Sequence, residues 1–261
     1  MEMSNQHKEV AELLRELKLK HFSEQFESDI MAMPEASREM MTAQLKLWAI
    51  KERAERKSQM IASKIKSAKF RQAQTVDNFD FKHNKVVEKI EKAYLALCND
   101  ISRDNLPSAV FSGNAGLGKT HLARALGYAA CQKGLSVLFL TAAEMVNRLA
   151  HAQKVFNLEQ ELNKYRRPQV LIIDELGYVS LDTQSSNLFF QVISSRHDQK
   201  LGTITTTNLS FGKFNQIFAN DAIAHAIVDR LVNEAEVFYM EGESYRPHQR
   251  TQNLKRKKEN A

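Results

Sequence analysis

The first 112 residues of this 261-residue chain contain no glycine, although the whole sequence has nine. Glycine supplies tight turns and close backbone approaches, so this absence argues against a loop-rich start and favours long helices. Only two cysteines are present, Cys98 and Cys131, without CxxC spacing, so we expect buried thiols rather than a disulfide or metal site. No apolar run approaches the ~18 residues of a membrane span, and residues 1–5 lack the layout of a signal peptide. We therefore expect a cytoplasmic protein with no membrane segment.

Apolar residues at helical spacing predict that the glycine-free part is all-helical. Two amphipathic helices are expected before Pro34, and a longer helix is expected after it. The residues of these apolar stripes are Val10, Leu13, Leu14, Leu17, Phe22, Phe26 and Ile30 before Pro34, and Leu47, Ile50, Ala54, Ile61 and Ile65 after it. We also place Trp48 of the long helix in the core.

Charge divides the helical part in two. Residues 1–45 hold five basic and nine acidic residues, whereas residues 46–71 hold nine basic and two acidic residues. In the second range a row of basic side chains runs along the helix, formed by Lys46, Arg53, Lys57 and Lys64. Such a row suits a nucleic-acid backbone because each neutralised phosphate releases condensed counterions, but a solvated helix face is an equally good interpretation. These four residues are therefore candidate DNA contacts, without base specificity.

A change of pattern near residues 70–82 marks the expected domain boundary. Beyond it, a helix is expected over about 84–98, and short apolar runs then alternate with helical stretches. The runs expected as strands are 109–111, 137–140, 170–173 and 203–207. Continuous apolar strands separated by helices are typical of a parallel sheet covered on both faces. The predicted organisation is an all-α domain over 1–76, an α/β domain over 77–250 and a basic tail over 251–261.

A glycine-rich loop follows the first expected strand. It matches the pattern G-x-x-x-x-G-K-[ST] and consists of Gly113, Asn114, Ala115, Gly116, Leu117, Gly118, Lys119 and Thr120. The glycines allow backbone N–H groups and a helix N-terminus to face a phosphate chain. We expect Lys119 to reach the β- and γ-phosphates, and the Thr120 hydroxyl to bind Mg²⁺. His121 is included among the nucleotide-binding candidates, although a helix residue at this position can also point away from the nucleotide.

Polar side chains end two further expected strands. Asp174 and Glu175 follow the run 170–173, and Asn208 follows the run 203–207. Asp174 is suited to hold Mg²⁺, while Glu175 is suited to polarise the water that attacks the γ-phosphorus. Asn208 is able to hydrogen-bond the γ-phosphate or that water, but asparagine is also a common turn residue.

Two arginines and two aromatic residues complete the candidates. Arg230 and Arg246 are able to stabilise charge on a transferring phosphoryl group, and an arginine from a neighbouring subunit would link hydrolysis to assembly. Spacing alone does not distinguish either residue from a surface ion-pair arginine. Phe79 and Phe81 either line an adenine pocket or simply pack at the domain junction.

These motifs occur together with several longer strings. The glycine-rich loop is followed by the helix 121–127, and later by the stretches 137–142, 172–178, 206–209 and 242–246. Together they resemble the IstB family, the AAA+ helper ATPases of bacterial insertion-sequence transposition, which are related to the helicase loader DnaC and the replication initiator DnaA. The basic helix and the segment 68–81 also resemble the family's N-terminal region and its junction with the ATPase domain.

The resemblance implies an α/β fold, an AAA+ P-loop parallel-sheet ATPase domain preceded by the all-α domain. It implies that Lys119 and Thr120 belong to Walker A, Asp174 and Glu175 to Walker B, and Asn208 to sensor 1. It also implies that Arg230 is an arginine finger acting in trans and that Arg246 is a sensor-2-like arginine. Only fifteen residues follow Arg246, so a full C-terminal helical lid is not expected, as in IstB and DnaC proteins.

The resemblance also implies a function. ATP and Mg²⁺ would be the ligands, and Mg-dependent ATP hydrolysis the reaction, in the bacterial cytoplasm. The partners would be duplex DNA bound with little sequence preference, further copies of the chain, and a transposase that the protein recruits or stimulates. A DnaC-type replicative helicase loader is the alternative, because it shares the ATPase core. A third hypothesis, a DNA-coating protein that does not hydrolyse nucleotide, is disfavoured by the intact Glu175.

Overall fold

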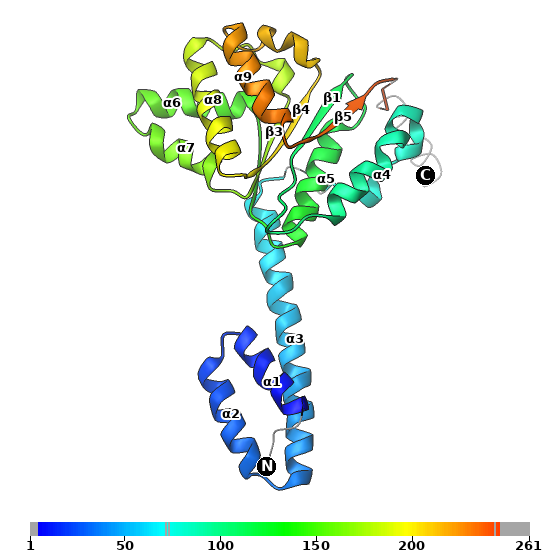
Figure 1. Cartoon of the computed structure of the whole chain (residues 1–261), viewed down its shortest axis with the longest axis vertical. Coiled ribbons are helices and arrows are strands. Elements are labelled where there is room, and N and C mark those ends of the chain that lie inside the picture. Colours follow the sequence, from blue (N-terminus) through cyan, green and yellow to red (C-terminus); the bar gives the residue numbers. More distant parts are fainter. Residues whose placement is uncertain (1–4, 71, 73, 243, 246–261) are drawn as a thin grey trace, which may run out of the picture. The chain divides into compact units, whose positions relative to one another are not determined.

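The computed structural model describes residues 5–70, 72, 74–242 and 244–245 (Figure 1). The chain divides into two compact units, Met1–Ala62 and Ser63–Ala261. This division falls earlier than the predicted boundary at residue 76, because Ile65, Ala68 and Phe70 pack into the core of the second unit. In the part that the structure describes, no helix combines the length and apolarity needed to cross a bilayer. Arg246 and the residues after it, including the predicted tail 251–261, lie outside the described residues. The structure therefore does not test the prediction that a full C-terminal lid is absent.

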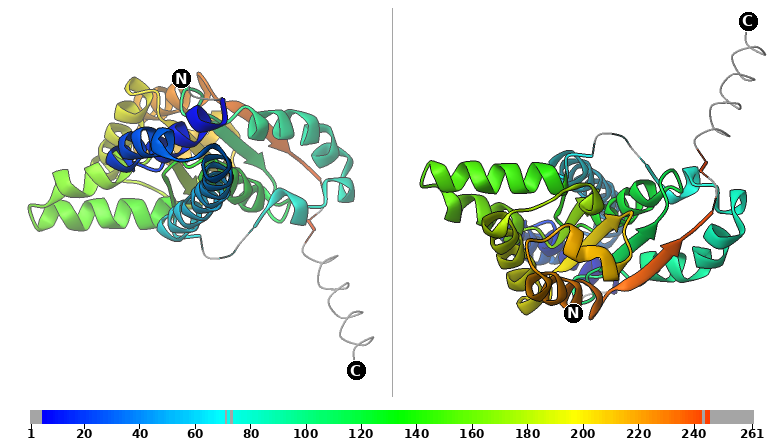
Figure 2. Two further views of the ribbon diagram at one scale, coloured as in Figure 1. Left: turned by 90° about the horizontal axis from the view of Figure 1, so that it is seen from below. Right: turned by 90° about the horizontal axis from the view of Figure 1, so that it is seen from above.

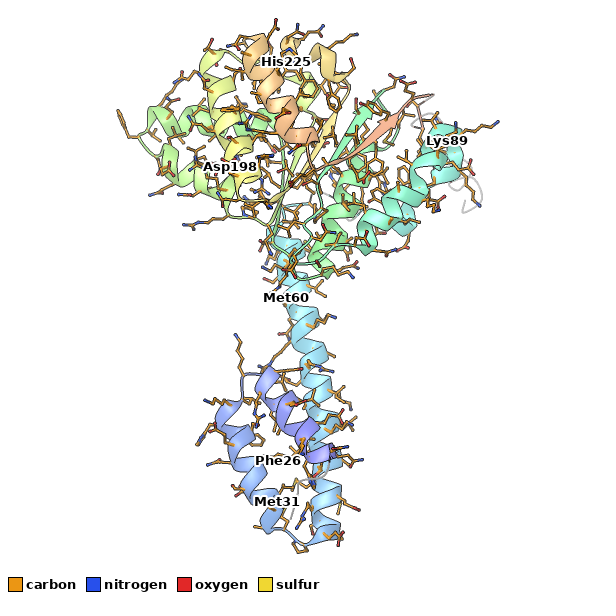
Figure 3. The ribbon with its side chains drawn as sticks, in the orientation of Figure 1. Phe26, Met31, Met60, Lys89, Asp198 and His225 are labelled. Carbon is orange, nitrogen blue, oxygen red and sulfur yellow. The ribbon has the colours of Figure 1, made fainter. Side chains whose placement is uncertain are left out.

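The first unit is helical, as predicted. It contains α1 (Asn5–Glu16), α2 (Lys20–Ala32) and most of α3 (Glu35–Ser67). The apolar stripe predicted for the first helix is confirmed, because its residues Val10, Leu13, Leu14 and Leu17 are all buried. Phe26 and Ile30 of α2 pack with Val10 and Leu14, and Figure 3 labels Phe26 where it lies within this unit.

The prediction of which face of α3 is buried is wrong for the first part of this helix. Leu47, Trp48 and Ile50 are exposed, with 56% of Trp48 accessible. Ala49 instead packs against Leu13 of α1 and against Leu17, the residue after α1. The sequence pattern correctly indicated an amphipathic helix. However, the small side chain of Ala49, between Lys46 and Arg53, allows α3 to pack more closely against α1 than the larger apolar residues would.

The described residues of the second unit form a five-stranded parallel sheet with the order β2-β3-β4-β1-β5. The strands are β1 (Ala109–Gly113), β2 (Val137–Thr141), β3 (Val170–Asp174), β4 (Gly202–Thr207) and β5 (Glu236–Met240). The four predicted strands are confirmed. The edge strand β5 is an addition, which the sequence analysis did not predict.

Helices cover both faces of this sheet (Figures 1 and 2). They are α4 (Lys85–Asn99), α5 (Lys119–Gln132), α6 (Ala142–Lys154), α7 (Leu158–Arg166), α8 (Thr183–Asp198) and α9 (Asp221–Val232), with 3-10 turns η1 (Val76–Asn78), η2 (Phe81–His83), η3 (Leu176–Tyr178) and η4 (Phe211–Gln216). Phe111 of β1 belongs to the apolar cluster with α4 and α5, whereas the adjacent Val110 belongs to the cluster with α6, α8 and α9. This alternation confirms a parallel sheet covered on both faces. Both cysteines are free, with Cys131 buried and Cys98 half-buried.

Candidate functional site

The glycine-rich loop lies between β1 and α5, at the carboxyl edge of the sheet. Strand β4 lies between β1 and β3, so the C-terminal ends of these three strands lie side by side at that edge. The chain leaves β1 for the far edge strand β2 and returns through β3 and β4, which makes this a topological switch point. Ligands of open α/β sheets bind in the crevice at such points.

The loop backbone requires glycine at two positions in particular. Gly113 has φ 144° and Gly118 has φ 90°, both in the region that side chains disfavour. A Cβ on Gly113 would lie 1.8 Å from the carbonyl oxygen of Met240 in β5, and one on Gly118 would lie 2.4 Å from the Phe79 ring. The loop therefore packs closely against its neighbours and ends at the first turn of α5, and the N-terminus of a helix suits a phosphate.

A cavity of about 590 Å³ opens at this loop. The whole stretch from Ala115 to His121 lines it, and so do Glu175, Thr206, Thr207 and Asn208 from the ends of β3 and β4. The predicted residues Gly113 and Asn114 precede that stretch, and their carbonyls accept hydrogen bonds of 2.7 Å from Lys119 Nζ. The structure thus brings the loop, Glu175 and Asn208 together around one cavity.

The two predicted metal ligands face each other. Thr120 Oγ1 donates to Asp174 Oδ1 at 2.8 Å, and Asp174 is only 2% exposed at the end of β3. A hydroxyl and a single carboxylate at a phosphate loop suit Mg²⁺, which takes the rest of its oxygen ligands from phosphates and water. Among the described residues no group of three His, Cys, Asp or Glu side chains forms an all-protein metal cage. Thr120 and Asp174 are therefore the residues that fit Mg²⁺ here.

Glu175 and Asn208 lie next to this pair. Glu175 is exposed to the cavity and has a left-handed backbone, φ 62° and ψ 35°. Asn208 Oδ1 is buried without a hydrogen-bond partner among the described residues. A buried acceptor without a partner is costly, so this amide is a candidate contact for a ligand or a water molecule. The 3-10 turn η3 passes close to it, because a Cβ on Gly177 would lie 1.8 Å from that oxygen.

An aromatic wall, formed by Phe79, His83 and Tyr245, closes another side of the cavity. The rings of His83 and Tyr245 are 4.6 Å apart, and those of Phe79 and His83 are 6.1 Å apart. Phe81 instead is buried in the core, 5.9 Å from the ring of Tyr94. Of the two alternatives left open for these phenylalanines, lining of the cavity holds for Phe79, whereas Phe81 packs in the core of the second unit.

The lining of the cavity also contains residues that the sequence analysis did not single out as site residues. They are Gln74, Asn78, Asp80, His83, Tyr178 and Tyr245. The change of pattern near residues 70–82 was interpreted only as a domain boundary, while Tyr178 and Tyr245 fall in the stretches 172–178 and 242–246, which were used only for the family resemblance. His121 anchors this segment to α5, because its Nε2 lies 2.9 Å from the Thr75 carbonyl oxygen. Burial lowers the pKa of His121 below its usual value.

The structure does not bring Arg230 to the cavity of its own chain. Its guanidinium lies 4.9 Å from the centre of the Phe190 ring and donates to the Ala226 carbonyl. Arg230 instead lines a second cavity of about 210 Å³ with Asp104, Lys200 and other residues. The predicted role in trans stays a prediction, as does that of Arg246, which lies outside the described residues.

The four basic candidates for DNA contact differ in their surroundings. Lys46 Nζ pairs with Glu9 at 2.7 Å, and Arg53 pairs with Glu16 at 2.9 Å, both within the first unit. Lys57 is exposed, and Lys64 is half-buried. The row is thus partly neutralised by α1, and DNA contact stays a prediction.

Comparison with known proteins adds relatives to this geometry. Residues 12–253 match the family described as IstB-like ATP binding protein. A protein of insertion sequence IS5376 from Geobacillus stearothermophilus, named for ATP binding, is 37% identical over 192 residues, covering 74% of this chain and 75% of that protein. Another, of insertion sequence IS21 from Pseudomonas aeruginosa, is 30% identical over 239 residues, covering 91% of this chain and 88% of that protein.

Solved structures show the same fold at low identity. The DnaC helicase loader matches with TM-score 0.55 and 22% identity, over 64% of this chain and 96% of that chain. AMPPCP-bound DnaA from Aquifex aeolicus matches with TM-score 0.54 and 18% identity, over 65% of this chain and 50% of that chain. These likenesses confirm the predicted α/β fold with a parallel sheet, which this chain shares with DnaC and DnaA. The family match over most of the sequence shows that the chain belongs to the family of IstB-like ATP-binding proteins.

Proposed function

We propose that this protein is an ATP-dependent, DNA-binding regulator of transposition. ATP binding builds an oligomer on duplex DNA, the oligomer recruits or stimulates a partner transposase, and hydrolysis of ATP resets the assembly. The observation that carries the proposal is the meeting of Thr120, Asp174, Glu175 and Asn208 at one glycine-rich loop. The names of the relatives, which belong to insertion sequences, favour transposition over helicase loading.

In this proposal the residues divide the work of phosphoryl transfer. The loop N–H groups and Lys119 hold the phosphates, and the rings of Phe79, His83 and Tyr245 border the side of the cavity suited to the base. Thr120 and Asp174 hold Mg²⁺, which when bound neutralises charge on the phosphate oxygens. Glu175 accepts the proton of the attacking water, and Asn208 orients that water or the γ-phosphate. Arg230 lies against Phe190, away from the cavity of its own chain, and in this proposal it acts on the γ-phosphate of a neighbouring subunit.

ATPase measurements with and without duplex DNA test this function. Because Arg230 would act across a subunit contact, activity per protein molecule should rise with protein concentration and with DNA. Glu175→Gln and Arg230→Ala should each be inactive alone, yet an equimolar mixture should recover activity at interfaces that pair an intact Glu175 with an intact Arg230. Activity strictly linear in protein, indifferent to DNA and not recovered on mixing would contradict the proposal. Co-purification with a replicative helicase rather than a transposase would favour the loader.

A further inference from the structure

Thr206 links the two carboxylate residues at the end of β3. Its hydroxyl donates to Asp174 Oδ1 at 2.6 Å and accepts from the backbone N–H of Glu175 at 2.9 Å. The side chain is only 2% exposed, and the bond to Asp174 is buried while the bond from Glu175 is partly buried. One hydroxyl therefore ties together the side chain of one residue and the backbone of the next.

This link has a specific effect on Glu175. A left-handed backbone is uncommon outside glycine, and Glu175 adopts it with φ 62° and ψ 35°. The N–H that Thr206 accepts belongs to that same residue, so the bond stabilises the sharp turn after β3. This turn sets the direction in which the Glu175 side chain leaves the backbone.

The link also orients Asp174. Oδ1 of this carboxylate accepts from Thr206 on β4 as well as from Thr120 on α5. Hydrogen bonds from residues outside the coordination sphere fix the direction of a metal ligand and tune its binding. Thr120 is a candidate ligand itself, so Thr206 is the donor that is able to hold Asp174 while Mg²⁺ occupies the site.

We propose that Thr206 is a positioning residue that holds Asp174 for Mg²⁺ and Glu175 for the attacking water. The inference rests on the proposed ATPase function, in which those two residues have these roles. Thr206 would then control the magnesium dependence of nucleotide binding and the rate of hydrolysis, with little effect on nucleotide binding without metal.

The neighbouring Thr205 provides a matched control. It is also fully buried on β4, but its hydroxyl has no hydrogen-bond partner among the described residues. In the sheet Thr205 pairs in register with Val110 and Ile173, which belong to the apolar cluster on one face. Thr205→Val and Thr206→Val therefore remove the same atom from adjacent positions, one without a bond and one with two.

The experiment compares Thr206→Val, Thr206→Ser and Thr205→Val in the full chain. For each we would measure kcat, the melting temperature, and the dissociation constant of a fluorescent ATP analogue with excess Mg²⁺ and with EDTA. Thr206→Val should lower kcat about 10- to 100-fold, the range for lost outer-sphere support of a metal site. It should also raise the dissociation constant with Mg²⁺ while leaving that with EDTA unchanged. Thr206→Ser should recover most of both losses, and Thr205→Val should behave as wild type.

Several results would overturn the assignment. One is that Thr206→Val keeps the kcat and the Mg²⁺ dependence of wild type. Another is that its affinity for the nucleotide analogue falls equally with Mg²⁺ and with EDTA. A third is the same defect in Thr205→Val, which would indicate an effect on packing in general. If Thr206→Val does not fold, Thr206→Ala is compared with Thr206→Ser by the same measurements. If the wild type itself hydrolyses no ATP, the proposed function fails, and the ratio of the two dissociation constants still decides whether Thr206 orients Asp174.

Discussion

Replacing Gly177 with alanine tests whether Asn208 takes part in hydrolysis. The added Cβ would lie 1.8 Å from Asn208 Oδ1 and 2.9 Å from Thr207 Oγ1, whereas ordinary contacts begin near 3.4 Å. Gly177 is not among the described glycines with positive φ, so its backbone accepts alanine. The least costly relief of the closest contact is a displacement of the Asn208 amide, the end of a side chain, by roughly 1.5 Å.

The size of the effect follows from that displacement. A misplacement of about 1 Å in a group that orients the reactants costs on the order of 100-fold in rate, or about 2.7 kcal/mol of transition-state stabilisation. Binding of ATP should change little, because the loop and Lys119 are untouched. The free energy of unfolding should stay within about 1 kcal/mol of wild type, since alanine at a compatible backbone also restricts the unfolded chain.

The assay combines phosphate release at saturating ATP, titration with a fluorescent ATP analogue, and urea unfolding. Gly212→Ala is the matched control, because nothing lies within 4 Å of a Cβ at Gly212. The double variant Gly177→Ala/Asn208→Ala separates the proposed cause from others. If alanine acts only by displacing the Asn208 amide, the double variant should be no slower than Asn208→Ala alone.

Two outcomes would refute the reasoning. Gly177→Ala with wild-type kcat would mean that the position of the Asn208 amide does not matter for hydrolysis. A double variant about 100-fold slower than Asn208→Ala would mean that Gly177→Ala acts through another group, such as the neighbouring Glu175.

Three other substitutions test the loop, its anchor and the basic row. Gly113→Ala should lower the free energy of unfolding by about 3 kcal/mol in urea titrations, because its Cβ would meet the β5 backbone at 1.8 Å; a loss under about 1 kcal/mol would contradict this. Burial lowers the pKa of His121 from 6.5 in the folded state. As the pH decreases below 6.5, the unfolded chain therefore binds a proton at His121 more readily than the folded chain does, and the free energy of unfolding decreases. His121→Asn should show a shallower fall in urea midpoint between pH 7 and 5.5, and an unchanged fall would exclude His121 as its source. Combined charge reversal at Arg53, Lys57 and Lys64 should weaken duplex binding equally for unrelated sequences and flatten its salt dependence; unchanged affinity would place the DNA surface elsewhere.

The centre of the candidate site could be predicted because its signals are local. The glycine-rich loop, the Asp174–Glu175 pair and Asn208 each stand at the C-terminal end of a strand. The carboxyl ends of parallel strands meet at one edge of a sheet, so three separate local patterns were enough to place these residues together. The cavity lined by Lys119, Thr120, Glu175 and Asn208 agrees with that argument.

Of the aromatic wall only Phe79 was a candidate, as one of two alternatives, and His83 and Tyr245 could not be predicted because distant segments bring them together. Tyr245 N–H bonds to the Gly116 carbonyl, and Asn84 Nδ2 donates to the Glu241 carbonyl, 157 residues away in the chain. Such contacts leave no periodic signal in a single sequence. For the same reason, the pattern of α3 revealed an amphipathic helix but not the face that α1 covers, and Trp48 was misplaced.

The role of Thr206 was hidden for a different physical reason. β-branched threonine is a favoured strand residue, so a run of threonines in β4 indicates a strand before it indicates chemistry. Thr205 and Thr206 are identical in type and burial, and alternate side chains of a strand point to opposite faces. The register decides which of them is useful: Thr205 is paired with Val110 and Ile173 of an apolar cluster, whereas Thr206 reaches Asp174 and Glu175. A hydroxyl becomes a candidate for function only once its partner across the sheet is known, and in this protein that partner lies 32 residues earlier in the sequence.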